Sequence, residues 1–169
     1  MRRPMRRKRQ LLSAEETVAI LDAATAGVLA VADKDDYPYA VPLSFAYEGG
    51  SIFFHSANAG YKLDAIDHSD KASFCVIADD DVVQETFTTH FRSAIVFGRI
   101  SVVTDDERKR HALWLLAEKY SPDCLDAADA EIDGSWDRTC VLELKIEEMT
   151  GKAALEIIKE RGRKTQPAE

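Results

Sequence analysis

Apolar positions near the start of the chain recur with the period of a helix. Val18, Leu21 and Ala24 fall on one face of such a helix. Before them, Ser13 and Glu16 have the spacing of a capping box, in which each side chain accepts the backbone N–H of the other residue. The pattern therefore predicts a helix that begins directly after Ser13.

Most other apolar positions fall in short continuous or alternating runs, which are typical of β-strands. We expect strands at residues 27–32, 37–47, 51–55, 72–77, 83–89, 91–103 and 139–146. Connections of only a few residues join antiparallel neighbours. Pro38 and Pro42 lack the N–H that a sheet requires, so the strand 37–47 is expected to be an edge, to be bulged or to be open to a ligand. Gly98 is expected to bend the strand 91–103.

Two further helices are predicted. A short one falls between Asn58 and Asp67, and a longer one follows a second capping box at residues 104–107 and ends at Pro122. The acidic stretch 123–137 is expected to be loop with partial helix. This order lacks the βαβ alternation of a parallel sheet, so it indicates a mainly β (α+β) fold with peripheral helices. A partly open barrel would bury so much β-surface economically.

A chain of 169 residues is long enough for one domain with a real core. We expect a basic N-terminal arm at residues 1–12, a domain at 13–158 and a polar tail at 159–169. The net charge is −8, although the arm holds six of the 22 basic residues, Arg2, Arg3, Arg6, Arg7, Lys8 and Arg9. The remaining 16 basic residues face 30 acidic ones, which argues against nucleic-acid binding by the domain. The arm is expected to pack on the acidic body or on a partner subunit, with contact to RNA, DNA or an acidic membrane as the alternative.

Several other classes of protein receive no support from the sequence. No apolar run approaches the ~20 residues that a membrane helix needs, and no secretory signal is recognised, so a cytoplasmic protein is expected. Cys75, Cys124 and Cys140 form no C-x-x-C pair and the histidines are scattered, so no metal site is expected. Neither G-x-S-x-G nor G-x-G-x-x-G occurs, which leaves a hydrolase or a Rossmann site without a motif.

The most informative segment is the strand-to-helix junction His55-Ser56-Ala57-Asn58-Ala59-Gly60-Tyr61-Lys62. Its small residues allow the backbone to approach a ligand, and the amides of a helix N-terminus favour a phosphate. Lys62 adds positive charge and Ser56 a hydroxyl donor. The alternative is an ordinary tight turn with a solvated Lys62. A histidine at the end of an apolar strand is either a hydrogen-bonded wall residue or a functional group.

Together these segments resemble the FMN-binding split barrels related to pyridoxamine 5'-phosphate oxidase, and within them the nitroimidazole-resistance (Nim-like) branch. The matching stretches are Met5-Arg6-Arg7-Lys8, Gly-Val-Leu-Ala at 27–30, Tyr37 to Phe45, Ile52 to Ala57, Gly60-x-Lys62 with Asp64-Ala65-Ile66, Phe91 to Gly98, and Met149-Thr150-Gly151-Lys152. They run in order from about residue 5 to residue 155. Each motif alone is weak, whereas the set is specific.

The resemblance implies a six-stranded antiparallel split β-barrel that forms a homodimer with two FMN sites at the subunit interface. Carried over by position, Ser56 and Lys62 would hold the phosphate, and the backbone of Pro42, Leu43 and Ser44 would line the isoalloxazine ring. The further contacts that it implies are His55, Ala57, Leu63, Arg92 and Ser93. The arginines that grip phosphate in true pyridoxamine-phosphate oxidases are not evident, so a different substrate is expected.

The function implied is an FMN-dependent, nitroreductase-like oxidoreductase that acts on small aromatic or quinone-like acceptors, with His55 as the candidate general acid. The alternative is a non-catalytic module that stores or senses a flavin, a haem or a deazaflavin. In a haem protein, His55 would suit an axial ligand.

Overall fold

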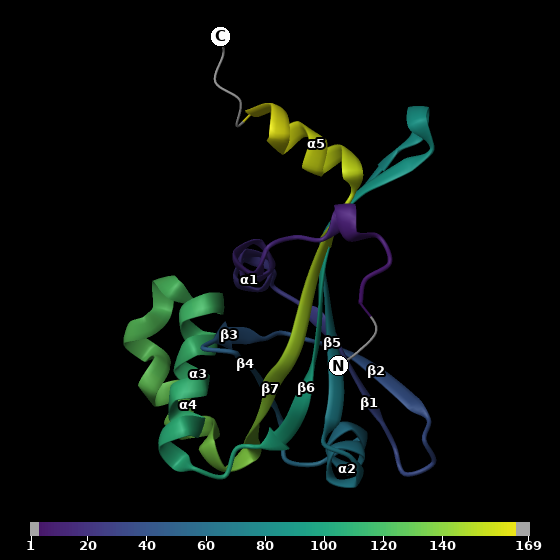
Figure 1. Cartoon of the computed structure of the whole chain (residues 1–169). Coiled ribbons are helices and arrows are strands. Elements are labelled where there is room, and N and C mark those ends of the chain that lie inside the picture. The colour runs from purple at the N-terminus through teal and green to yellow at the C-terminus, as the bar shows by residue number, and fades with distance from the viewer. Residues whose placement is uncertain (1–3, 165–169) are drawn as a thin grey trace. The chain divides into compact units, whose positions relative to one another are not determined.

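The computed structural model describes residues 4–164 of the chain. Its strands are β1 (Gly27–Ala32), β2 (Pro38–Leu43), β3 (Ala46–Glu48), β4 (Ser51–Ala57), β5 (Lys71–Val83), β6 (Thr88–Val102) and β7 (Thr139–Ala153). Its α-helices are α1 (Ala14–Ala23), α2 (Tyr61–His68), α3 (Asp106–Tyr120), α4 (Ala128–Ser135) and α5 (Leu155–Lys164). Its 3-10 helices are η1 (Lys8–Gln10), η2 (Gln84–Thr86), η3 (Pro122–Ala127) and η4 (Trp136–Arg138). Figure 1 shows these elements.

The strands form one seven-stranded sheet in the order β2-β1-β5-β6-β7-β4-β3. The pairs β1–β2, β3–β4 and β4–β7 are antiparallel, which confirms the mainly β, antiparallel prediction. The sheet has one strand more than the six expected. No helix in the described part of the chain is long and apolar enough to cross a membrane.

The segment predicted as one strand, 37–47, is two strands, whereas the separate strand predicted at 83–89 is absent: β5 ends at Val83, η2 spans Gln84–Thr86 and β6 begins at Thr88. β2 pairs with β1, whereas β3 pairs with β4, and Ser44 and Phe45 connect them. Phe45 is fully buried, and its backbone N–H donates to the Tyr120 hydroxyl at 2.8 Å. The same hydroxyl lies 2.7 Å from the carbonyl oxygen of Thr25. β2 ends the sheet order, so of the three arrangements that its two prolines allowed, an edge, a bulge or an opening to a ligand, the structure shows the edge.

The described chain divides into two compact units. Unit 1 consists of residues 4–24, 75–95 and 149–164, and unit 2 of residues 25–74 and 96–148. Residues of β5, β6 and β7 belong to both. Arg2 and Arg3 of the predicted arm, and residues 165–169 of the predicted tail, lie outside the described residues. The rest of that tail is helical in α5, which the sequence did not predict.

In unit 1, the predicted capping box at α1 is confirmed. The backbone N–H of Glu16 donates to the Ser13 hydroxyl at 3.2 Å, and that of Ser13 donates to the Glu16 carboxylate at 2.9 Å. The buried residues of α1 are Thr17, Ile20 and Leu21, so the buried face is rotated relative to the predicted one. Thr17 reaches this face because its hydroxyl donates to the Ser13 carbonyl at 2.7 Å, which satisfies the polar group.

In unit 2, the core contains three phenylalanines in edge-to-face contact. Phe74 lies 4.8 Å from Phe45 and 5.1 Å from Phe54 between ring centroids. A second cluster joins the sheet to a helix through Phe53, Ala112 and Val141, all fully buried. It positions α3 against β4, and Figure 1 shows α3 and α4 side by side next to β3 and β4.

Two predictions about this helical region need correction. The N-cap of α3 is Asp105, whose carboxylate accepts the Arg108 N–H at 2.8 Å, so the predicted box at Thr104 begins one residue too early. Residues 123–137 are mostly helical, in η3, α4 and η4, and hold little loop. Ala128 and Ile132, four residues apart, are the buried positions of α4, a pattern too sparse among acidic residues to be recognised as a face.

Candidate functional site

The junction between β4 and α2 brings Ser56 and Lys62 together. The Lys62 ammonium donates to the Ser56 hydroxyl at 2.5 Å, and this hydroxyl donates to the Ala57 carbonyl at 3.0 Å. Ser56 is buried and Lys62 half-buried. Across residues 4–159, Lys62 forms no ion pair with a carboxylate. No acidic side chain of unit 2 therefore neutralises the Lys62 ammonium.

Gly60 sets the start of α2. It has φ 131°, a conformation that side chains rarely adopt, and its carbonyl accepts the Leu63 N–H at 2.8 Å. The first amides of a helix have no partner within it, and with Leu63 bonded to Gly60, the amides of Tyr61 and Lys62 are the ones left available near Ser56. An N-terminal amide group beside an ammonium and a hydroxyl is an arrangement suited to an anion.

Tyr61 joins α2 to the β1–β2 hairpin. Its hydroxyl donates to the Asp33 carboxylate, which also accepts the N–H groups of Asp35 and Tyr37 at 2.8 Å. Donation to Asp33 raises the pKa of Tyr61 to about 12, and the same bond lowers the pKa of Asp33. Tyr39 packs edge-on against Tyr61 with centroids 4.8 Å apart. The sequence did not predict this contact, although an Asp at the start of a turn between two strands often accepts the amides of that turn.

Successive side chains of a strand point to opposite faces, and β4 divides the predicted residues accordingly. Ser56 is buried, whereas His55 and Ala57 are exposed on the other face. In the pairing with β7, His55 lies opposite Val141 and Ser56 opposite Cys140. Of these three predicted contacts, Ser56 therefore points to one face of the sheet and His55 and Ala57 point to the other.

The remaining predicted contacts lie elsewhere. Pro42 and Leu43 end β2, and Ser44 follows; Leu43 is half-buried and the other two are exposed. Leu63 is half-buried in the first turn of α2. Arg92 and Ser93 belong to β6 in unit 1, where the Arg92 guanidinium donates to the Asp79 carboxylate. This bond raises the pKa of Arg92 and occupies part of its donor set.

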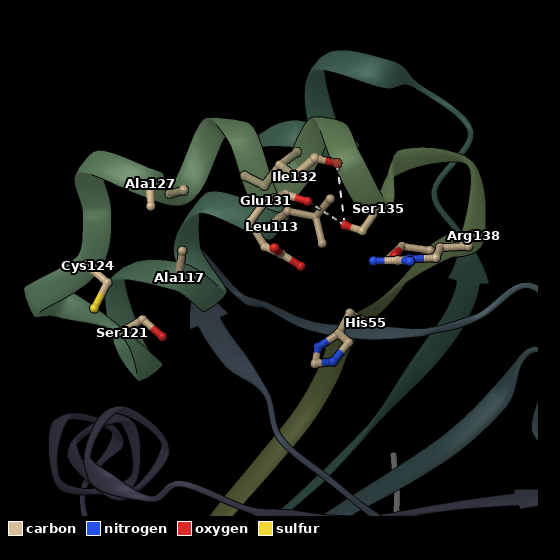
Figure 2. A pocket seen from close by; sticks show the side chains of 12 residues that line it. His55, Leu113, Ala117, Ser121, Cys124, Ala127, Glu131, Ile132, Ser135 and Arg138 are labelled. Carbon is tan, nitrogen blue, oxygen red and sulfur yellow. Dashed lines mark hydrogen bonds between the residues drawn. The ribbon is translucent and has the colours of Figure 1, made fainter.

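His55 faces a cavity that the sequence did not predict. The cavity has a volume of about 590 Å³ and lies against α3, η3, α4 and η4. Its lining residues are His55, Leu113, Ala117, Ser121, Cys124, Ala127, Ala128, Glu131, Ile132, Ser135, Arg138 and Thr139. Figure 2 shows Ser135, Arg138 and His55 toward one end, and Ser121 and Cys124 toward the other. No signal in the sequence joins His55 to residues 113–139, because only packing brings them together.

The described residues give little support to a metal site or to chemistry at the buried cysteine thiols. Within residues 4–164, no group of three or more His, Cys, Asp or Glu side chains is placed to hold a metal ion. Burial raises the pKa of the Cys75 and Cys140 thiols, which disfavours their thiolates. Cys124 is exposed at the cavity.

Comparison with known proteins identifies the family. The family model described as pyridoxamine 5'-phosphate oxidase matches residues 13–153, most of the chain. The chain belongs to this family. An uncharacterized protein of Rhizobium meliloti (strain 1021), RA0666, is 27% identical over 154 residues, which cover 86% of this chain and 95% of that protein.

Solved structures of this family's fold include several proteins with described roles. A proposed 5-nitroimidazole antibiotic resistance protein from Bacteroides thetaiotaomicron has a TM-score of 0.69 and 23% identity, over 84% of this chain and 85% of its own. An FAD-binding protein from Mesorhizobium loti has a TM-score of 0.61 and 26% identity, over 86% and 97%. An FAD and heme binding protein from Mycobacterium smegmatis has a TM-score of 0.71 and 24% identity, over 86% and 73%.

Proposed function

We propose that this protein binds FMN and acts as an oxidoreductase that reduces small aromatic acceptors. The observation that carries the proposal is the contact between Lys62 and Ser56 at the start of α2, in a chain of the pyridoxamine 5'-phosphate oxidase family. A phosphate at this position would receive the ammonium and the N-terminal amides of α2 as donors, and also the Ser56 hydroxyl once its hydrogen turns away from the Ala57 carbonyl. The residues present thus fit the phosphate end of FMN.

The end of β2 supports a place for the flat part of the cofactor. Among the described strands, β2 pairs with β1 alone, so its outer backbone groups are unpaired in the sheet. The exposed residues Pro42 and Ser44 leave the backbone there accessible to a ring. When bound, the flavin would supply the electron transfer, and the protein would orient it and exclude water.

His55 is the candidate proton donor to the acceptor. Its imidazole is exposed at the cavity, and across the described residues it makes no hydrogen bond or ion pair. An imidazole can donate the proton that a reduced acceptor requires. Unchanged turnover of flavin-loaded His55→Ala would remove His55 from the mechanism.

The first test is the visible absorption spectrum of freshly purified protein, with identification of the cofactor released on denaturation. Bands near ~450 nm and released FMN support the proposal. Turnover with NADH or NADPH and a nitroaromatic acceptor then tests the enzyme assignment. A colourless protein that also fails to bind added FMN would overturn it.

A cofactor carrier or sensor is the second candidate. The observation in its favour is the same unpartnered His55 at a cavity of about 590 Å³, together with similarity to a protein described as binding FAD and heme. A Soret band lost in His55→Ala would assign haem ligation to this residue. Released FAD or a deazaflavin, with no turnover, would indicate a flavin carrier in place of an FMN enzyme.

We further propose a homodimer that forms through unit 1. Ile77 and Val82 of β5 are 65% and 69% exposed, and Phe87 is 97% exposed. Exposed apolar groups of this size gathered on one hairpin are typical of an interaction surface. Contact of this hairpin with a second copy of the chain would bury these three side chains.

A further inference from the structure

The cavity beside His55 contains an arginine without an acidic partner. Unit 2 has four arginines, and three of them pair with carboxylates: Arg99 with Asp70 and Glu147, Arg108 with Glu143, and Arg110 with Asp129 and Asp133. Arg138 forms no such pair with any described residue, although the chain holds 30 acidic residues. Its guanidinium is therefore available to an anion from outside this unit.

The direction of Arg138 makes it part of the cavity. It ends η4, directly before β7, and Figure 2 shows its side chain reaching toward the cavity on the side of His55. A planar guanidinium in a concave site binds a carboxylate through two parallel hydrogen bonds. The position thus favours a ligand with a carboxylate at this end.

The other polar groups of the cavity restrict the ligand further. The Ser135 hydroxyl donates to the Glu131 carbonyl at 2.8 Å, so its hydrogen is already used. The Glu131 side chain is exposed and forms no hydrogen bond or ion pair with a described residue. A carboxylate accepts hydrogen bonds and repels a second anion. The cavity therefore suits one negative charge at Arg138 and a donor, such as a hydroxyl, at Glu131.

The remaining walls are mainly apolar, with His55, Ser121, Cys124 and Thr139 as further polar or thiol-bearing positions. Leu113, Ala117 and Ile132 are among the residues that line the space between these polar groups. A volume of about 590 Å³ lies within the range of small-molecule sites. Largely apolar walls with a few placed polar groups are typical of a small-molecule site, and an aromatic ring is a ligand part that suits them.

We propose that this cavity is a binding site for a small aromatic monocarboxylate that carries a hydroxyl group, with its carboxylate on Arg138 and its hydroxyl on Glu131. The proposal goes beyond the flavin function and concerns equilibrium binding alone. It needs neither a bound flavin nor turnover, so its failure is distinguishable from failure of the flavin proposal.

The test is isothermal titration calorimetry of the purified full chain with 4-hydroxybenzoate and with its neutral analogue 4-hydroxybenzamide. We expect saturable binding at one site per chain, with 4-hydroxybenzoate bound at least ~10-fold more tightly. In Arg138→Gln this preference disappears. Arg99→Gln is the matched control, because Arg99 is an exposed arginine of the same unit outside the cavity, and it keeps the preference.

Glu131→Gln tests the other end of the ligand. The ratio of the affinities for 4-hydroxybenzoate and benzoate is expected to fall in this variant, because the hydroxyl loses a charged acceptor. Thermal unfolding of each variant establishes that the chain remains folded. Absence of binding to the wild type, equal binding of the acid and the amide, or an undiminished preference in a folded Arg138→Gln would overturn the proposal.

Discussion

The carboxylate of Glu143 in β7 receives two hydrogen bonds from the Arg108 guanidinium of α3. Nε of Arg108 lies 2.9 Å from one carboxylate oxygen and Nη2 lies 2.5 Å from the other. The Ser51 hydroxyl donates to Glu143 at 2.7 Å. Only 4% of Glu143 is exposed, so this pair fixes α3 to the sheet with a nearly buried charge. The cavity beside His55 depends on the position of the same helix.

Loss of this pair is expected to destabilise the protein in a pH-dependent manner. The hydrogen bond from Arg108 lowers the pKa of Glu143 from its ordinary value of 4.5. The pair therefore stabilises fully above that value, and the contribution disappears as the pH falls through the lower pKa of the folded chain. We expect Arg108→Met to reduce the free energy of unfolding by ~1–3 kcal/mol at pH 7, with a smaller deficit near pH 3.

Urea denaturation of wild type and variant at both pH values measures this difference. Arg110→Met is the control, because its acidic partners are exposed and its ion pairs are expected to contribute ~1 kcal/mol or less. An equal deficit at pH 7 and pH 3 would contradict the role given to the Glu143 charge.

Gly98 is expected to tolerate no side chain. A Cβ at this position would lie 2.0 Å from the carbonyl oxygen of Lys145, a backbone atom of β7. We expect Gly98→Ala to lower the free energy of unfolding by roughly 2–4 kcal/mol. Gly134→Ala is the matched control: no atom lies within 4 Å of its Cβ, and alanine in a helix is expected to stabilise by ~0.5–1 kcal/mol. Denaturant midpoints that shift equally in Gly98→Ala and Gly134→Ala would contradict the close approach of Gly98 to the Lys145 carbonyl.

Lys62 is expected to be necessary for phosphate binding and unimportant for folding. Lys62→Met removes a half-buried ammonium that hydrogen-bonds to Ser56. If FMN binds as proposed, the dissociation constant of FMN rises at least ~10-fold, since a charge-assisted contact is lost. Fluorescence quenching of added FMN measures it, and the exposed Lys71→Met, at the start of β5, should match wild type. Comparable FMN binding in both variants would argue against phosphate at this junction.

Phe87 is expected to contribute to the proposed dimer. It is 97% exposed and lies in the left-handed conformation, with φ 51°, after η2. Phe87→Ser should shift the mass measured by light scattering during size-exclusion chromatography from that of a dimer toward that of a monomer at low micromolar concentration. Tyr37→Ser, which changes a 72% exposed aromatic residue in unit 2, serves as the control. A monomeric wild type would refute the dimer.

Local patterns in the sequence predicted local structure well. The cap of α1 depends on Ser13 and Glu16, three residues apart, and two prolines restricted β2 to an edge, a bulge or an opening to a ligand, of which it is an edge. The strand-to-helix junction that holds Ser56 and Lys62 was also predicted, whereas the hydrogen bond between the two side chains was found only in the structure. Thr104 and Asp105 can both act as an N-cap, and at this point the predicted start of the helix was one residue too early.

The sequence alone thus determined the antiparallel β-rich class and the family, and it placed Ser56 and Lys62 at one strand-to-helix junction, since each rests on residues near one another or on ordered motifs. The tertiary structure decided which face of β4 each residue serves and which distant residues meet it. His55 and Arg138 line one cavity only because buried contacts such as Phe53 with Ala112 hold α3 on the sheet. Contacts between distant segments depend on the packing of whole elements, and no periodicity along the chain records that packing.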